Sequence, residues 1–450
     1  MNAQSTSLTE GSIWRTLLRF ALPLFLGNLF QQLYNTADAW TVGNFCGNDA
    51  LAAVASSGSL CHLLVGFFQG AFIGGSVIIS QHYGARHRET VENAVHTIVL
   101  LSLGTGVFLS VAGILLTPLI LTWMGTPDNV MPSSILYFRV YCAGLLSLTL
   151  YNTATGIFQA LGDSRHPLYY LMISSIVNVV LDLLFVAAFR WGVAGAALAT
   201  VLSQTLSAVL GFARLMGPRS PARIRLSRLR LDRPLAGQML RLGLPSGVQN
   251  SVIAVANLVV QSNINAFGDL AMSGCGSYFK VEGFVFLPIT SLTLAMTTFI
   301  SQNLGAGRPD RALRGSRLGL LMTVASAEAI GIIFFLFAPV LIALFSKDPE
   351  VVAYGVRQAR VETLFYCLMA FSHGVAAILR GAGRAITPMV VMLAVWCVFR
   401  ILYITVTVYF IPDITVVFSA YPLTWAISAL LFAIAYFKGD WLHQHLPRAA

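Results

Sequence analysis

The stretch SQHYGA at residues 80–85 occurs a second time, as SQNLGA, at residues 301–306. On its N-terminal side, LRFALP at 18–23 returns as LRLGLP at 240–245. Further pairs keep the spacing that separates residue 80 from residue 301: Pro118 and Pro339, Arg139 and Arg360, and Gly162 and Gly383. A constant spacing over so long a stretch predicts that the chain consists of two copies of one unit.

The composition places both copies in a membrane. The 450 residues are 56% hydrophobic and only 10% charged, and the mean hydropathy is +0.75. A soluble protein carries about 25% charged residues, whereas about 20 apolar residues span a bilayer as a helix. Twelve such stretches are expected, at 18–42, 51–80, 93–121, 133–158, 167–189, 192–216, 239–265, 272–301, 315–345, 357–379, 387–411 and 420–437.

The fold class follows from the repeat and the number of spans. We predict an all-α polytopic membrane protein with twelve transmembrane helices in two six-helix lobes. An even number of spans returns the chain to the same side, so a pseudo-twofold axis along the membrane normal is expected to relate the lobes. The expected division is 1–216 for the N-lobe, 217–238 for a basic cytoplasmic linker, and 239–450 for the C-lobe.

The net charge of +10 reflects topology rather than nucleic-acid binding. Lys and Arg are concentrated in alternate loops, and eight arginines fall between Arg214 and Arg241. An excess of basic residues marks the cytoplasmic loops of membrane proteins. We therefore expect a multi-pass protein of the bacterial inner membrane with both termini in the cytoplasm, in contact with the lipid bilayer and with no nucleic-acid partner.

Two aspartates interrupt the apolar spans of the first copy. Asp38 lies in the first span and Asp182 in the fifth, where the second copy has Val260 and Tyr403. A charged side chain at the bilayer centre costs about 2.5–3.5 kcal/mol on insertion scales, and such residues usually mark ion pathways. A structural role shared by both lobes would have placed acids in both copies.

Helical spacing groups these aspartates with other polar side chains. Residues four positions apart lie on the same helix face, and three such pairs are Tyr34 with Asp38, Asn178 with Asp182, and Ala196 with Thr200. Together they can present two carboxylates, an amide, a phenol and a hydroxyl to one pocket. A site of this kind accepts a proton or a small hard cation such as Na⁺. The alternative is that each aspartate merely bonds a neighbouring helix.

The second copy has buried charges of its own. Lys280 and Glu282 fall in the eighth span and Arg400 in the eleventh. Glu282 and Arg400 could neutralise each other, or the set could face a cavity in the C-lobe and contact substrate. Pro23 lies low in the first span, where proline removes a backbone hydrogen bond and can kink the helix.

Catalytic and nucleotide-binding motifs are missing from the sequence. It has no HExxH and no GxSxG, which argues against an intramembrane enzyme. It also has no P-loop, so any energy for transport must come from an ion gradient or a partner. No cofactor is expected beyond a coupling ion, H⁺ or Na⁺, and no metal beyond Na⁺ at Asp38 and Asp182.

Six short stretches together resemble one family: QQLYNTAD, SQ..GA in both copies, NVVLD, GVAGAALAT, QALGDSRHP and LRGAGRAITP. The chain resembles a multidrug and toxic compound extrusion (MATE) transporter of the DinF-like branch. The resemblance implies a cation site at Asp38, Asn178, Asp182, Thr200 and, through its backbone oxygen, Ala196, with Tyr34 nearby and with Pro23 as the bending point of the first helix. The corresponding NorM-like acids are missing from PSGVQNSV (245–252) and AFSHGVAAI (370–378).

These observations predict a secondary antiporter that works by alternating access. It would export amphipathic organic cations, such as drugs or toxic compounds, in exchange for H⁺ or Na⁺, and function as a monomer. The alternative is a flippase or exporter of lipid-like or lipid-linked cargo, for which a basic cavity would be expected.

Overall fold

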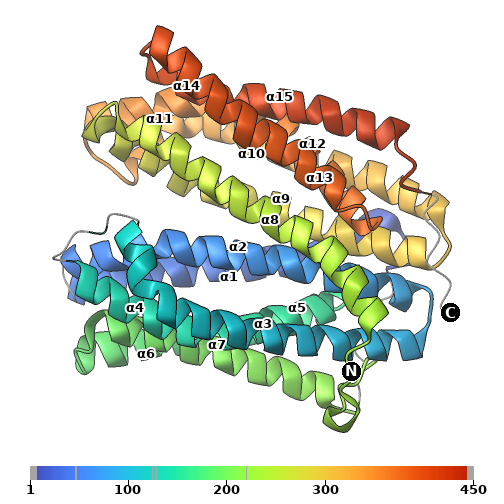
Figure 1. Cartoon of the computed structure of the whole chain (residues 1–450). Coiled ribbons are helices and arrows are strands. Elements are labelled where there is room, and N and C mark those ends of the chain that lie inside the picture. The colour runs from blue at the N-terminus through green and yellow to red at the C-terminus, as the bar shows by residue number, and fades with distance from the viewer. Residues whose placement is uncertain (1–7, 46–47, 124–125, 127–129, 219, 443–450) are drawn as a thin grey trace. The chain divides into compact units, whose positions relative to one another are not determined.

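The computed structural model describes residues 8–45, 48–123, 126, 130–218 and 220–442. The described residues form helices and connecting turns only, as predicted (Figure 1). The helical elements are α1 (Ile13–Phe45), α2 (Asn48–Gly84), α3 (Arg88–Trp123), α4 (Met131–Ala143), α5 (Leu145–Ala160), α6 (Arg165–Asp182), η1 (Leu183–Ala188), α7 (Gly192–Met216), η2 (Leu226–Arg228), α8 (Arg233–Asn265), α9 (Asp269–Gly305), α10 (Pro309–Ala343), α11 (Pro349–Glu362), η3 (Thr363–Phe365), α12 (Tyr366–Gly381), α13 (Ile386–Met392), η4 (Leu393–Phe399), α14 (Arg400–Phe410) and α15 (Ile414–Lys438).

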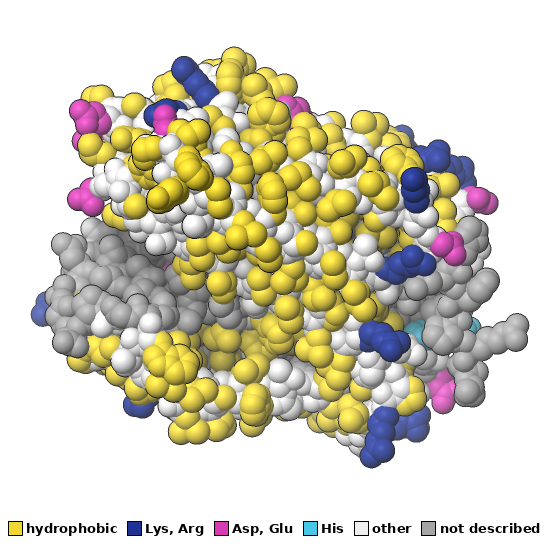
Figure 2. Space-filling model, turned by 45° about the horizontal axis from the view of Figure 1, so that its top comes forward, with side chains coloured by type: hydrophobic (Ala, Val, Ile, Leu, Met, Phe, Trp, Pro, Cys, Tyr) yellow, Lys and Arg dark blue, Asp and Glu magenta, His cyan; other side chains and the backbone are white. Residues whose placement is uncertain are grey.

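These elements make up the twelve expected spans. Among the described residues, nine helical segments are long and apolar enough to cross a membrane, and α4 with α5 forms a further span bent by 44°. The long helices α1 and α2 complete the set. Hydrophobic side chains cover most of the visible surface, with charged ones near the helix ends (Figure 2). Lipid can solvate such a surface, whereas soluble proteins rarely expose large apolar patches.

The internal repeat extends to the bounds of the elements. Helix α2 begins and ends 221 positions before α9, and α5 begins and ends 221 positions before α12. The fourth span of each copy is broken at the matching place, before α5 and at η3. Gly162 and Gly383 both adopt a left-handed conformation, with φ of 82° and 81°. Because a side chain is strained there, glycine is the residue that suits both turns.

The chain divides into two compact units that do not coincide with its two sequence copies. One unit contains Leu26–Gly243, and the other contains Leu8–Phe25 with the residues from Leu244 onward. Two helices, α1 and α8, therefore pass from one unit into the other. Each passage lies within two or three residues of a proline inside the helix, Pro23 in α1 and Pro245 in α8. Proline deletes one helical hydrogen bond, so both helices are weakened where they change units.

The start of α8 packs closely against α2 in the first unit. A Cβ atom on Gly74 would lie 2.3 Å from the carbonyl oxygen of Met239, and one on Gly243 would lie 2.2 Å from that of Ala71. The two backbones approach this closely because neither glycine carries a side chain. The preceding segment also belongs to this unit, since Ile224 is buried in its core and the Arg225 N–H donates to Nε2 of His96 over 3.2 Å.

In the second unit, residues 8–25 pack against the other helices. Leu17, Phe20 and Ala21 belong to the same buried cluster as Ala295 and Phe299 of α9. Ala21 and Ala295 occupy the repeat positions of Gly243 and Gly74. Polar contacts secure the segment, because the Leu8 N–H donates to Oε1 of Gln302 over 3.1 Å and Arg308 Nη1 donates to the Thr9 carbonyl over 2.7 Å.

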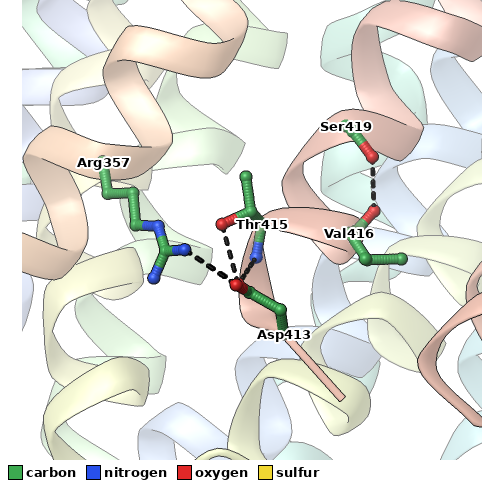
Figure 3. Close-up of polar contacts among 5 residues, drawn as sticks. All are labelled: Arg357, Asp413, Thr415, Val416 and Ser419. Atoms are coloured by element: carbon green, nitrogen blue, oxygen red, sulfur yellow. Dashed lines mark hydrogen bonds and ion pairs between the residues drawn. The ribbon is translucent and has the colours of Figure 1, made fainter. Parts of the chain in front are cut away.

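The last span begins at a capped helix end. Asp413 precedes α15, and one of its carboxylate oxygens accepts hydrogen bonds of 2.8 Å from both the N–H and the hydroxyl of Thr415 (Figure 3). Arg357 of α11 donates to both oxygens of the same carboxylate, over 2.9 and 3.0 Å. These contacts join α11 to α15. The Thr415 N–H, then its hydroxyl and Arg357, hold the pKa of Asp413 below its ordinary value.

Candidate functional site

Three elements of the first unit meet around the predicted carboxylates. Val42 of α1, Val186 of η1 and Ala196 of α7 form a small buried cluster. Val42 follows Asp38 by four residues, and Val186 follows Asp182 by four. Because side chains four apart share a helix face, this cluster places both carboxylates on the faces where α1, η1 and α7 come together.

Asp182 is buried and Asp38 is half-buried, and carboxylate oxygens of both lack hydrogen-bond partners among the described residues. Asp182 and Asn178 of α6 are each only 1% exposed. Five buried polar atoms have no hydrogen-bond partner within the part of the chain described. They are both carboxylate oxygens of Asp182, both amide atoms of Asn178, and Oδ1 of Asp38. Leaving a buried ion without a partner costs several kcal/mol. An ionised carboxylate at Asp38 or Asp182 is therefore unfavourable unless a proton or a cation neutralises it.

The remaining predicted residues of this cluster lie beside the acids. Asp38 and Asp182 interact electrostatically, and so do Tyr34 and each of them. The hydroxyl of Thr200 donates to the carbonyl of Ala196 over 3.1 Å. That bond occupies the hydroxyl proton but leaves oxygen lone pairs on both groups. The structure thus places Tyr34, Asp38 and Asp182 within electrostatic reach of one another. Ala196 lies in the cluster that joins their helices, and Asn178 and Thr200 lie one helical turn from Asp182 and Ala196.

Two residues of this region were missed in the sequence. The Tyr34 phenol is hydrogen-bonded to the side chain of Gln204 of α7, and Tyr151 of α5 also acts on it electrostatically. Gln204 follows Thr200 by four residues, so the spacing that grouped the other partners could have found it. Tyr151 lies in the fourth span, and the sequence carries no signal that brings it to this place.

Helix α6 changes its winding directly after Asp182. Residues Leu183–Ala188 form a π-helical segment. In the second unit, Leu393–Phe399 does the same directly before Arg400. Short π-helical segments occur often at functional sites. The two segments do not correspond in the repeat, yet each adjoins a charged residue within a span, Asp182 in the first unit and Arg400 in the second.

The second unit contains a pocket of about 360 Å³. Five of its eleven lining residues are aromatic, namely Phe279, Phe286, Trp396, Tyr421 and Trp425. The charged side chains in its wall are Glu282 of α9 and Arg400 of α14. A largely apolar pocket with a few polar groups is the usual form of a small-molecule site.

Arg400 is held by neutral groups rather than by an acid. Its Nη2 donates to Thr424 over 3.0 Å and its Nη1 to Asn257 over 3.5 Å. Its guanidinium carbon lies 4.5 Å from the ring centre of Tyr421 and 5.2 Å from that of Trp396. The direct ion pair with Glu282 that the sequence suggested is not among the ion pairs of the described residues. The aromatic faces and Thr424 hold the guanidinium instead.

Lys280 lies apart from this pocket. Its side chain is exposed, and its ammonium group lies 5.5 Å from the ring centre of Phe345. The grouping of Lys280 with Glu282 in one cavity is therefore corrected by the structure. The reason is helical geometry, because residues two positions apart point to different sides of a helix.

A second buried acid, Glu362, lies near Glu282 and was not among the residues predicted from the sequence. Glu362, the last residue of α11, is fully buried, and its Oε2 lies 3.0 Å from the hydroxyl of Tyr278. That hydroxyl lies 3.2 Å from Oε1 of Glu282. Glu362 falls within the predicted tenth span and precedes Tyr366 by four residues, so its position in the sequence was signal enough.

Comparison with known proteins identifies the family. The MatE family model matches residues 23–184 and again 245–406, once in each copy of the repeat. The chain belongs to the MatE family. As a member of this family the protein is a transporter and not an enzyme.

The relatives of this MatE protein cover nearly its whole length. It is 29% identical to the probable multidrug resistance protein YoeA of Bacillus subtilis over 98% of this chain and 96% of the relative. It is also 29% identical to the probable multidrug resistance protein YpnP of B. subtilis over 87% and 88% of the two chains. A solved MOP superfamily transporter from Pyrococcus furiosus, 22% identical, superposes with a TM-score of 0.92 over 99% of this chain and all of the other. The twelve-helix fold is that of these transporters.

Proposed function

We propose that this MatE protein is a secondary antiporter that exports amphipathic, cationic drugs or toxic organic compounds in exchange for H⁺ or Na⁺. The single observation that carries the proposal is the cluster of unpartnered buried oxygens on Asp38, Asn178 and Asp182. Export of small molecules agrees with the relatives named multidrug resistance proteins. The lack of a P-loop supports an ion gradient, rather than nucleotide hydrolysis by this chain, as the source of energy.

The coupling ion binds the cluster of the first unit. A proton neutralises one carboxylate at once, while Na⁺ would take oxygen ligands from Asp38, Asp182, Asn178 and Thr200, with the Ala196 carbonyl and Tyr34 adjacent. Both ions remove the penalty of an unpartnered buried charge. Exchange requires that ion and substrate favour opposite states of the transporter, because a ligand shifts an equilibrium only through its differential affinity.

The lobes would alternate in access through helices that bend. Pro23 is the proposed bending point of α1, and the passage of α1 between the two compact units at Phe25 and Leu26 supports this role. The protein would act as a monomer in the bacterial inner membrane with both termini in the cytoplasm. The basic loops of the sequence support that orientation.

The lining of the pocket supports organic cations over lipid-like cargo as the substrate. Arg400 by itself would favour an anionic headgroup. Its guanidinium is already covered by Tyr421 and Trp396, however, and Glu282 lies in the same wall. Aromatic faces beside a carboxylate suit an amphipathic cation. A flippase of lipid-linked cargo remains the competing function, and a fluorescent anionic lipid tests it in the same vesicles.

Transport in vesicles tests the antiport. We expect efflux of ethidium from vesicles to be driven by an imposed pH or Na⁺ gradient, and to be lost in Asp182→Asn. The matched control is Glu328→Gln, which changes another carboxylate within a span. Its Oε2 accepts from the N–H of Cys367 over 3.0 Å, and glutamine can keep that bond. Folded Asp182→Asn protein that still transports at the full gradient-driven rate would refute the role of the cluster.

A further inference from the structure

Four oxygen-bearing side chains meet in the core of the second unit. Tyr278 and Glu282 come from α9, Glu362 from α11 and Tyr366 from α12. Tyr278, Glu362 and Tyr366 are fully buried, and Glu282 is 8% exposed. Gln358 donates from Nε2 to Oε1 of Glu362 over 2.9 Å. Phe334 stacks on the Tyr278 ring with 5.5 Å between ring centres, which closes the group on one side with an apolar surface.

The oxygen–oxygen contacts outnumber the protons that the tyrosines can supply. The Tyr278 hydroxyl lies 2.8 Å from the Tyr366 hydroxyl, 3.0 Å from Glu362 and 3.2 Å from Glu282. The Tyr366 hydroxyl lies 3.4 Å from Glu282. Each hydrogen bond needs one proton between its oxygens, and each phenol provides one. Even without the longest contact, three remain for two phenolic protons, which is the arrangement expected when a carboxyl group also holds a proton.

Within the described part of the chain, no positive charge lies in direct contact with the two carboxylates. Among the described residues neither forms an ion pair, and Arg400 acts on them only through weaker electrostatics. Two buried carboxylates that share one hydroxyl repel each other when both are ionised. The arrangement is therefore the one expected when carboxyl protons are present.

Of the two acids, Glu282 and Glu362, only Glu282 lines the pocket. Glu282 lines the pocket of about 360 Å³, whereas Glu362 does not and reaches it through Tyr278. Arg400 lines the same pocket. With both acids protonated, these three charges sum to +1, and with both ionised they sum to −1. The charge of the pocket thus depends on the protons held behind its wall.

We propose that Glu282 and Glu362, joined by Tyr278 and Tyr366, form a proton-binding site in the second unit, and that an organic cation binds the adjacent pocket by displacing protons from it. This inference rests on the proposed function and gives its substrate pocket a proton site separate from that of Asp38 and Asp182. Protons and organic cations then compete within one unit, as exchange requires.

Other titratable groups around the pair do not replace it. Cys275 on α9 acts on Glu362, Cys397 of η4 acts on Arg400, and Tyr421 of α15 acts on Arg400. Each is neutral in its ordinary state near pH 7. Glu328 of α10 bonds the Cys367 backbone and does not line the pocket. Among the described residues, Glu282 and Glu362 are therefore the acids placed to change the pocket's charge.

The test measures proton release when a cation binds. The full-length protein is prepared in lipid nanodiscs with Asp38→Asn and Asp182→Asn, so that the first unit cannot release protons. Tetraphenylphosphonium is added in weakly buffered solution with a pH indicator. We expect about one proton or more to be released per bound cation. The apparent Kd for tetraphenylphosphonium should fall about tenfold for each unit by which the pH rises, per proton displaced.

Variants then assign the protons. Glu362→Gln and Glu282→Gln should each reduce proton release, and together they should abolish it and leave binding weak and independent of pH. Glu328→Gln in the same background should release protons like its parent. If Glu362→Gln does not fold, Tyr278→Phe removes the shared hydroxyl with little change in shape and should also reduce proton release.

The outcomes separate this inference from the proposed function. Binding without proton release, or release unchanged by Glu282→Gln and Glu362→Gln, overturns the proton site. Full gradient-driven export by Asp182→Asn overturns the antiport at the first unit and leaves the proton release unaffected. Binding of an anionic lipid in place of tetraphenylphosphonium would also overturn the inference, since protonation would then strengthen binding.

Discussion

Asp182 and Glu362 are both buried acids inside membrane spans, yet their surroundings differ. Neither oxygen of Asp182 has a hydrogen-bond partner within the described residues. Both oxygens of Glu362 have one, in Gln358 and Tyr278. The difference teaches that a buried acid can be accommodated in two ways. One is to leave its oxygens open for a ligand, and the other is to enclose them in a network that holds protons.

Replacing each acid by leucine should separate these two roles most strongly. We expect Glu362→Leu to lower the free energy of unfolding by about 3 kcal/mol, because two buried partners lose their acceptor at about 1–3 kcal/mol each. Asp182→Leu should leave stability equal or higher, because it removes a buried group without partners. Thermal unfolding in nanodiscs gives both values, and equal destabilisation by the two variants would contradict the comparison.

A second comparison concerns the two helices that pass between the units, α8 where it packs against α2 and α1 where it packs against α9. We expect Gly243→Ala to cost about 1–3 kcal/mol, because its Cβ would meet the Ala71 carbonyl and a packed interface tolerates extra volume poorly. At the repeat position in the other unit, Ala21→Gly should cost about 1 kcal/mol, mainly through the helix propensity of glycine. Unfolding of both variants checks this. A Gly243→Ala protein as stable as the wild type would show that the contact between α2 and α8 can accommodate the added methyl group.

Replacing the two prolines at the unit boundaries tests whether α1 and α8 bend there during transport. Pro23→Ala and Pro245→Ala each restore a helical hydrogen bond where α1 and α8 change units. We expect ethidium export to fall in both variants while stability changes by less than about 1 kcal/mol. The control is Pro118→Ala in α3, a helix that stays within one unit. If export falls in Pro118→Ala as well, the effect does not belong to the boundaries.

The smallest effect is expected at the start of α15. Asp413 caps this helix, whereas α7 in the first copy begins after Trp191 without a side-chain cap. Asp413→Ala should cost about 1 kcal/mol through the lost cap, and Arg357→Ala less than about 1 kcal/mol because exposed ion pairs contribute little.

The contribution of Asp413 should also depend on pH. The pKa of Asp413 is held below its ordinary value, first by the Thr415 N–H. Its stabilisation is thus complete above the unfolded pKa of about 3.9 and is lost as the pH falls through the lower folded value. The stability difference between wild type and Asp413→Ala should shrink over that range. A difference that is constant with pH would rule out the carboxylate as its source.

The candidate residues of the first unit could be grouped from the sequence because their signals are local. Tyr34 with Asp38, Asn178 with Asp182, and Ala196 with Thr200 follow from the helical period alone. Tyr151 could not be found this way, because it comes from a different span and its proximity depends on packing between helices. Glu362 was visible in the tenth span, but only the fold connects it to Tyr278 on α9, 84 positions earlier.

The sequence by itself determined the twelve spans, the two copies and the first unit's acids, because hydropathy and helical period are properties of neighbouring residues. Only the tertiary structure decided that Leu8–Phe25 packs with the second unit and that Lys280 lies away from the pocket. It also decided that Glu282 and Glu362 share a hydroxyl. These features depend on which faces of distant helices meet, and helix packing sets those contacts rather than the order of residues along any one helix.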